Sequence, residues 1–330
     1  MPTADQLKAL VRSFCDKDDA QFFAIALQMA AAEARKGHHE LAGELKALID
    51  KGKVHSASFI SSRNPISIVT PRGELADLLN VSHPETRLSE MILTKELCKR
   101  IERIISEQRQ INKLKGHNLY PRQKLLLTGA PGCGKTMTAS VLAGELRLPL
   151  MVVRLEGLIT KYLGESASKL RLIFDAIEKT RAVYLFDEFD SIGFERGSGL
   201  DVGEIRRILN SFLTFMEYQA GNSLLVAATN CAQNLDSALF RRFDDLLEFE
   251  KPQSQLIIET FKRRLCLVPG KENLDFKKIA LEAKGMSFAE IIKTCDEAIK
   301  EMILGDKTEI NTGNLVKALR ERRAFLKGRE

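Results

Sequence analysis

The chain has 330 residues, of which 44% are hydrophobic and 28% charged, the ordinary composition of a folded globular protein. Its 50 basic and 44 acidic side chains give a formal net charge of +6, too small a surplus to indicate a nucleic-acid-binding protein by itself. No apolar run approaches the roughly 18 residues that cross a bilayer, and the first residues lack the pattern of a secretory signal. We therefore expect a cytoplasmic protein without a membrane segment.

Residues 1–53 are expected to form a small helical domain. Apolar residues recur there at three- and four-residue spacing in the stretches 7–14, 19–37 and 39–52. The stretch carries eight basic and eight acidic side chains and no evident catalytic group, so a role as an adaptor or in partner binding is expected. Residues 54–88 are rich in Ser, Pro, Asn and Gly and predict a linker, with room for a short strand and a brief helix at 74–80.

Residues 89–252 alternate between apolar runs and amphipathic segments. The expected strands lie at 124–130, 148–156, 180–190, 222–230 and 245–250, and the expected helices between them at 137–147, 166–180 and 203–219. Continuous apolar strands between amphipathic helices indicate an α/β fold, in which a parallel sheet is covered by helices on both faces. After residue 253 the strands stop, and four helical patterns predict a small α-helical lid domain over 253–330.

The segment Gly129–Thr136, GAPGCGKT, fits the pattern G-x-x-x-x-G-K-[ST] between a predicted strand and a predicted helix. Glycines let successive backbone N–H groups turn toward phosphate oxygens, and the start of the following helix attracts the same anion. Lys135 is expected to reach the β- and γ-phosphates, and the Thr136 hydroxyl to bind Mg²⁺. The residues expected to bind ATP and Mg²⁺ are Pro131, Gly132, Cys133, Gly134, Lys135, Thr136, Met137 and Asp187.

Two later strands end in polar side chains. VYLFDEFD (183–190) ends in carboxylates, of which Asp187 is expected to serve Mg²⁺ and Glu188 to polarise an attacking water. Asn230 closes LVAATN (225–230) and is expected to orient that water. Taken singly, such residues are usually caps or turn residues, but here they follow a phosphate loop and together predict ATP hydrolysis.

Paired arginines, Arg241 and Arg242, occur in LDSALFRRFD (235–244) before the last predicted strand. An arginine supplied across a subunit boundary can stabilise charge on the transferring phosphoryl group. The alternative is an ordinary surface pair.

In this order and spacing the segments resemble the classical branch of the AAA family of ATPases over about residues 89–300. GAPGCGKT resembles the Walker A motif, LFDEFD the Walker B motif and AATN the sensor-1 segment, and the arginine pair resembles the residues that act on a neighbouring subunit's nucleotide. KGMSFAEI (284–291) is similar to the sensor-2 segment at the start of a lid helix. The resemblance implies adenine contacts from residues 90–93 and 285–289.

A further likeness implies a mechanical function. KYLGES (161–166) resembles the family's first pore loop, with the triplet Tyr162, Leu163 and Gly164, and the glycine-rich stretch 196–204 lies where a second pore loop would be. In an assembled ring such aromatic side chains grip extended polypeptide without reading its sequence. The resemblance thus implies a homo-oligomer, a hexameric ring, that threads or remodels protein substrates.

Two other functions compete with this one. Residues 251–330 carry 17 basic and 12 acidic side chains, including KRR (262–264) and RERR (320–323), which permits a nucleic-acid-directed ATPase of the loader or transposition-helper type. A nucleotide-switched scaffold is a third hypothesis, which Glu188 disfavours. The overall layout also resembles bacterial ATPases encoded beside subtilisin-like serine proteases, which implies a protease partner.

Overall fold

The computed structural model describes residues 71, 73–158, 165–190, 201–218, 221–235 and 237–327, together with positions 26 and 43. The chain divides into two compact units, residues 1–68 and 69–330, and the described residues fall almost wholly in the second unit. The helical domain expected at 1–53 and most of the expected linker therefore lie outside the described residues. None of the described helices has the length and hydropathy of a membrane-spanning segment.

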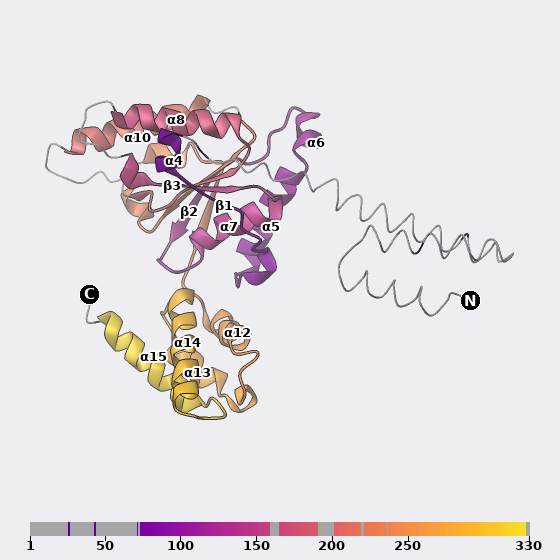
Figure 1. Ribbon diagram of the computed structural model, residues 1–330, viewed down its shortest axis with the longest axis vertical. Helices are drawn as coiled ribbons and strands as arrows, with labels where there is room; N and C mark the ends of the chain where they lie inside the picture. Colours follow the sequence, from indigo (N-terminus) through magenta and orange to yellow (C-terminus); the bar gives the residue numbers. More distant parts are fainter. Residues whose placement is uncertain are drawn as a thin grey trace. The chain divides into compact units, whose positions relative to one another are not determined.

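A six-stranded sheet with the order β1-β3-β4-β5-β2-β6 forms the centre of this second unit (Figure 1). The strands are β1 Leu79–Ser82, β2 Lys124–Gly129, β3 Leu150–Val153, β4 Val183–Phe186, β5 Leu224–Thr229 and β6 Asp245–Phe249. β2 to β6 pair in parallel, whereas β1 runs antiparallel to β3 at the edge of the sheet. The α/β fold expected from the sequence is confirmed.

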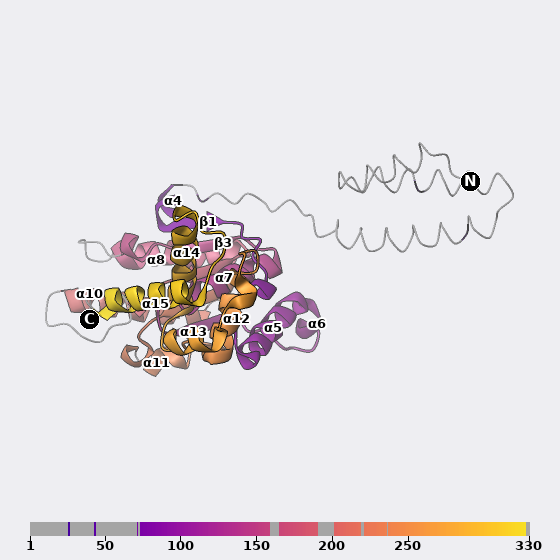
Figure 2. The same cartoon turned by 90° about the horizontal axis from the view of Figure 1, so that it is seen from below.

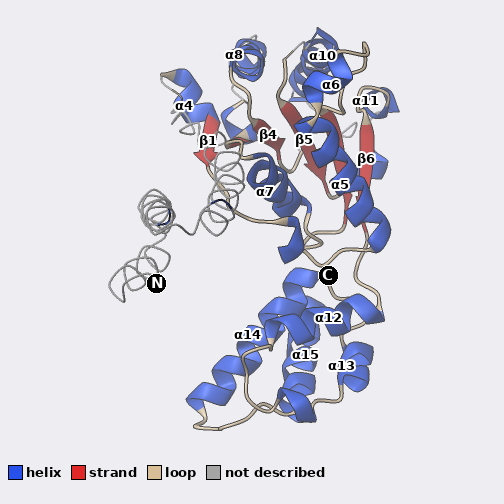
Figure 3. Cartoon of the chain, turned by 90° about the vertical axis from the view of Figure 1, so that its right-hand side faces the viewer, coloured by secondary structure: helices blue, strands red, loops and turns tan. Residues whose placement is uncertain are grey.

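Helices cover both faces of the sheet (Figures 1 and 3). α5 (Lys95–Arg109) and α7 (Lys135–Leu146) pack on one face, and α8 (Glu165–Lys179) and α10 (Asp201–Tyr218) on the other. Alternate residues of each strand serve the two faces: Leu125 and Leu127 belong to the α5/α7 core, and Leu126 to the α8/α10 core. This double burial is the reason that the central strands are mostly apolar.

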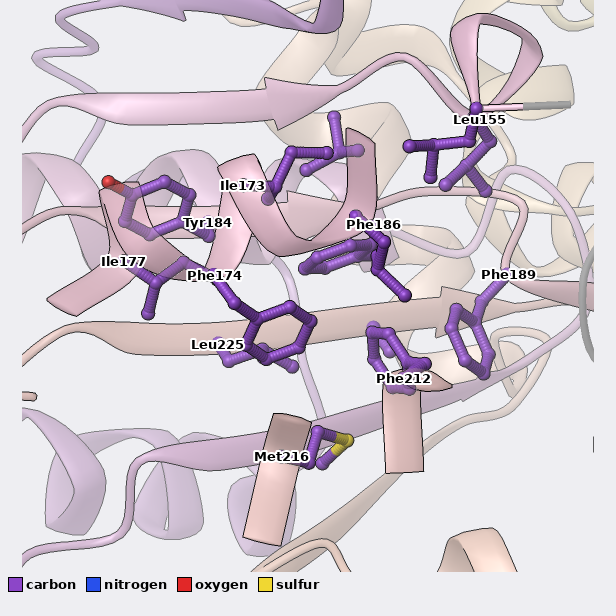
Figure 4. Close-up of a cluster of buried hydrophobic side chains, with 14 of the residues drawn as sticks. Leu155, Ile173, Phe174, Ile177, Tyr184, Phe186, Phe189, Phe212, Met216 and Leu225 are labelled. Carbon is purple, nitrogen blue, oxygen red and sulfur yellow. The ribbon is translucent and has the colours of Figure 1, made fainter. Parts of the chain in front are cut away.

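The core under α8 and α10 is rich in aromatic side chains (Figure 4). Phe212 of α10 lies at its centre, with ring centroids 5.1 Å from Phe186, 5.6 Å from Phe174 and 4.8 Å from Phe189. Phe189 follows the two carboxylates that end β4 and is fully buried. The turn that carries those carboxylates is therefore anchored in the core.

Some elements lie in stretches for which the sequence predicted no helix. Others lie within the expected linker. α5 has the signals of a helix, since Thr94 accepts a hydrogen bond from the Leu97 N–H as its N-cap and Leu97, Ile101 and Ile104 form a buried stripe. α4 (Glu74–Leu78) is the brief helix expected at 74–80, and β1 follows it within the expected linker. Two short helices, α6 (Ile111–Lys115) and α11 (Ser237–Phe240), complete the α/β part.

Four helices of the C-terminal part form a bundle with a core of its own (Figure 2). They are α12 Ser254–Arg264, α13 Phe276–Glu282, α14 Phe288–Leu304 and α15 Thr312–Lys327, in agreement with the four helical patterns of the sequence. Ser287 caps α14: its hydroxyl accepts from the Glu290 N–H, and the Glu290 carboxylate accepts from the Ser287 N–H. This capping box fixes where α14 begins, and that start lies against the glycine loop.

The Gly144→Ala variant is expected to be less stable than the wild type. A Cβ at Gly144 in α7 would lie 2.3 Å from the carbonyl oxygen of Thr86, and a backbone atom has little freedom to move away. Overpacking of this kind costs about 1–3 kcal/mol, which corresponds to a Tm lower by roughly 2–12 °C. Gly116→Ala is the matched control, because the nearest atom lies at 3.4 Å and the backbone there is ordinary right-handed helix. Equal Tm values for the two variants in a thermal melt would contradict the expectation.

Candidate active site

Three neighbouring strands bring the candidate site residues to one edge of the sheet. β4, β5 and β2 are adjacent in this order and parallel, so their carboxyl ends lie together. The glycine loop follows β2, Asp187 and Glu188 follow β4, and Asn230 follows β5. The strand order places Asn230 between the carboxylates and the glycine loop.

The glycine loop lies against the first turn of α14. Gly132 has a positive φ of 73°, and a Cβ there would lie 2.8 Å from the Ser287 hydroxyl and 2.9 Å from the Ala289 Cβ. The Ala289 N–H donates to the Gly132 carbonyl over 3.1 Å. Only glycine combines this backbone conformation with so close an approach. The structure therefore places residues 287–289 of the predicted adenine-contacting segment directly on the loop.

Lys135, the first residue of α7, is buried and hydrogen-bonded. Its Nζ donates to the carbonyl oxygens of Gly129 over 2.7 Å and Ala130 over 2.9 Å, and to Oδ1 of Asn230 over 2.8 Å. Burial lowers the pKa of this ammonium, and the charges of Asp187 and Asp190 oppose the shift. Three fixed acceptors thus hold the ammonium where strands β2 and β5 end.

Thr136 and Asp187 meet beside this lysine. The Thr136 hydroxyl donates to Oδ2 of Asp187 over 2.7 Å, and both side chains are accessible to solvent. A hydroxyl and a carboxylate are hard oxygen donors of the kind that Mg²⁺ prefers, and Mg²⁺ is usually bound by one or two such groups together with substrate phosphates. This pair therefore fits the expected metal. Among the described residues, no group of three or more His, Cys, Asp or Glu side chains is arranged to hold a metal ion.

Glu188 is exposed and has a left-handed backbone conformation, with φ of 50°. Its N–H donates to Oδ1 of Asp187 over 2.9 Å, and the following residue, Phe189, donates its N–H to the Ala228 carbonyl over 2.8 Å. A non-glycine residue in this conformation costs about 1–3 kcal/mol and is held there by its surroundings. The buried Phe189 side chain and its N–H bond to the Ala228 carbonyl of β5 fix this conformation, and the Glu188 carboxylate faces solvent.

Sequence reasoning did not single out Asp190, which also belongs to this site. Its charge acts on Lys135, and its Oδ1 is buried without a hydrogen-bond partner among the described residues. The signal was present in DEFD, because Asp190 lies three positions after Asp187, and residues three apart in a helical turn lie on the same side.

A cavity of about 350 Å³ lies beside the glycine loop. Leu93 and Phe288, from the two segments expected to contact adenine, line it together with Cys133 of the loop. Sequence reasoning missed the rest of the lining: Thr94, Glu96, Leu97, Arg100, Glu248, Phe249, Glu250, Lys251, Gln253 and Leu256. Met91 lies close by, since its Cε would be 3.2 Å from a Cβ at Gly134.

Arg241 and Arg242 lie at the amino end of strand β6, opposite to the carboxyl ends of the strands where the glycine loop lies. They precede β6, whose first residue, Asp245, pairs in parallel register with Leu125 near the start of β2, whereas Phe249 pairs with Gly129. The arginines are thus separated from their own glycine loop by the length of β6, about 13 Å at 3.3 Å per residue. Figure 3 shows α11, which ends just before Arg241, beside β6.

Several arginines of the basic runs in the C-terminal bundle bind other groups within it. Arg264 pairs with Asp296 at 2.7 Å, Arg320 with Glu282 at 2.8 Å, and Arg323 donates to the Lys284 carbonyl at 3.1 Å. These side chains already serve intramolecular roles, so the charge surplus of this region gives little support to nucleic-acid binding. Tyr162, Leu163 and Gly164 lie outside the described residues, as does most of 196–204.

A strand, a glycine loop, a helix and carboxylates on the next strand but one define a P-loop nucleoside triphosphatase. Residues 125–251 match the family described as "ATPase family associated with various cellular activities (AAA)". The chain is 33% identical to the uncharacterized AAA family ATPase y4kL of Sinorhizobium fredii over 321 residues, which cover 97% of this chain and 96% of that protein. The chain therefore belongs to the AAA family, as the sequence motifs indicated, and is an ATPase.

Other relatives match only part of their own length. The chain is 35% identical over 189 residues to the human ATPase family gene 2 protein homolog A, covering 54% of this chain and 21% of that protein. It is 32% identical over 194 residues to the ATP-dependent zinc metalloprotease FtsH of Marinobacter nauticus, covering 57% of this chain and 31% of that protein. Most of each longer protein lies outside the match, so the remaining activities of these proteins do not carry over.

Proposed function

We propose that the chain is one subunit of an ATP-driven ring, a hexamer, that threads or remodels protein substrates. The observation that carries this proposal is the separation of Arg241 and Arg242 from their own glycine loop across β6. Arginines at the amino end of β6 cannot contact the nucleotide of their own subunit, but they can contact the nucleotide of a neighbouring subunit. Each complete catalytic site would then require two copies of the chain.

Within one subunit the proposed roles follow the geometry of the site. Residues 131–137 hold the ATP phosphates, and Lys135 exchanges its carbonyl and Asn230 contacts for phosphate oxygens. Thr136 and Asp187 would hold Mg²⁺, which supplies positive charge that offsets the charge of the phosphates. Glu188 accepts a proton from the attacking water, and Asn230 orients that water. The cavity beside Leu93, Cys133 and Phe288 takes the adenine.

The proposed division of labour places hydrolysis in residues 89–252 and the lid in residues 253–330. Contact between Gly132 and the start of α14 supports a lid that responds to nucleotide, because the same loop holds the phosphates. Residues 1–53 would bind a partner or substrate through the linker at 54–88. A protein substrate is supported by the FtsH relatives, which are named as proteases, and by the triplet Tyr162, Leu163 and Gly164. A separate subtilisin-like serine protease is the partner that the gene-pair resemblance implies.

Threading predicts that Tyr162→Ala loses stimulation of ATP turnover by an unfolded protein. Casein serves as the probe, and the ratio of casein-stimulated to basal turnover is measured, so that differences in basal turnover cancel. The wild type is expected to show a ratio above two and Tyr162→Ala a ratio near one, because the aromatic grip is lost. Tyr120→Ala is the matched control, since Tyr120 is a highly exposed tyrosine elsewhere, at 76%. Equal ratios for all three proteins would remove the threading proposal.

A further inference from the structure

The two adjacent arginines have different surroundings. Nη2 of Arg242 is ion-paired with Oε1 of Glu217 in the last turn of α10, and its Nε is buried without a partner among the described residues. Its backbone N–H donates to the Leu239 carbonyl over 3.0 Å. Arg241 is exposed and forms no ion pair or side-chain hydrogen bond within the described part of the chain. One arginine is therefore held by its own subunit, and the other has no such partner among the described residues.

Glu217 projects from the end of α10, which is held in place by its neighbours. The residue before it, Met216, is fully buried in the aromatic core (Figure 4). The Met216 carbonyl also accepts a hydrogen bond from Nζ of Lys124 at the start of β2, over 2.5 Å. The end of α10 is thus fixed to the sheet on two sides, and Glu217 gives Arg242 a stationary partner.

The turn that carries the arginines is fixed on its other side as well. Asp244 accepts the backbone N–H groups of Gln123 over 2.7 Å and Lys124 over 2.9 Å. Asp245 is ion-paired with Arg100 of α5 and, at 3.4 Å, with Arg122. The turn is rigid on both sides, so a side chain that projects from it starts from a defined position.

We infer that the two arginines divide the work: Arg241 reaches the nucleotide of the neighbouring subunit, and Arg242 is a positioning residue that Glu217 holds in place. This inference rests on the proposed ring. The Glu217–Arg242 pair restricts the conformations of the turn between α11 and β6. Arg241 therefore projects from a fixed backbone, and less conformational entropy is lost when it binds the neighbouring nucleotide. The pair is partly exposed, with side-chain exposures of 37% for Arg242 and 45% for Glu217, so it acts by fixing geometry rather than by adding much stability.

Two alternative roles for Arg242 and Glu217 predict different results from the bracing role. A guanidinium in one ion pair keeps free N–H donors, so Arg242 could also contact the neighbouring nucleotide. Glu217 could instead be a latch that withholds Arg242 until subunits assemble. In the first case Arg242→Ala is as harmful as Arg241→Ala while Glu217→Gln has no effect, and in the second Glu217→Gln raises turnover.

The experiment measures kcat and KM for ATP, together with sedimentation velocity with ATP, for full-length variants. Arg241→Ala is expected to lose at least about 100-fold in kcat, because arginines supplied in trans are worth several orders of magnitude. Mixing it with Lys135→Ala should restore turnover, since some interfaces then join an intact glycine loop to an intact Arg241. Arg242→Ala and Glu217→Gln should each lose about 3- to 10-fold in kcat, and the double variant no more than either.

Conservative and swapped variants separate bracing from a general structural defect. Arg242→Lys keeps the ion pair and should retain at least half of the wild-type kcat, whereas Arg241→Lys should lose about 10-fold or more, because lysine cannot replace bidentate guanidinium contacts. The swap Glu217→Arg with Arg242→Glu should recover more than half of what Arg242→Ala loses. An equal loss for Arg241→Ala and Arg242→Ala, or a rise in turnover for Glu217→Gln, overturns the inference while the ring proposal stands. A wild type that neither assembles with ATP nor loses specific activity on dilution overturns both.

Discussion

The Glu188→Gln variant is expected to turn over ATP at least about 100-fold more slowly than the wild type while binding ATP at least as tightly. Removing a general base costs roughly 10²–10⁴-fold in rate. Glutamine has nearly the same shape, so the φ of 50° and the anchoring by Phe189 should survive the change. The lost carboxylate charge also lies near the phosphates, so its removal does not oppose ATP binding.

This variant also tests assembly, because bound ATP persists in it. Sedimentation velocity at micromolar concentration should show a species several times the mass of one chain with ATP and less of it without nucleotide. Glu178→Gln is the matched control: Glu178 is an exposed glutamate on α8, and its replacement should leave kcat within twofold of the wild type. Wild-type turnover in Glu188→Gln would contradict the general-base role, and a monomer in the presence of ATP would contradict the ring.

The sequence was sufficient to predict the strands that build the site. β2, β4 and β5 are buried on both faces, so most of their residues are apolar, and a glycine, a carboxylate or an amide follows closely on each apolar run. The four C-terminal helices were predictable for a related reason, since each buries one stripe. Edge strand β1 was only weakly indicated because its burial alternates and it is four residues long.

The contacts between strand ends were not predictable from one sequence. That Lys135 meets Asn230 depends on β5 lying between β4 and β2, and nothing in the local pattern determines this order. The cavity lining was missed for the same reason, because Thr94, the N-cap of α5, and Leu256 of α12 lie at opposite ends of the ATPase region in sequence. The Glu217–Arg242 pair joins residues 25 positions apart on two elements whose packing the pattern leaves open.

The Lys135→Ala variant is expected to bind ATP about 100-fold more weakly or worse, and therefore to lose turnover. A charge-assisted hydrogen bond is worth about 1.5–3 kcal/mol, and two phosphate groups would share this ammonium. A loss of about 2.7 kcal/mol corresponds to a 100-fold change in Kd. Kd is measured by isothermal titration with a slowly hydrolysed ATP analogue.

The structural side of this change needs its own control, because Nζ of Lys135 also bonds to Gly129, Ala130 and Asn230. Lys124→Ala is suited to this purpose. Lys124 lies at the other end of the same strand, β2, and its Nζ donates to the Met216 carbonyl of α10. Each variant removes a lysine of β2 or its loop that donates to backbone carbonyl oxygens, so both should lower Tm, but only Lys135→Ala should raise Kd. If Lys124→Ala weakened ATP binding equally, the loss would come from a loosened β2 rather than from a missing phosphate ligand, and the role assigned to Lys135 would be wrong.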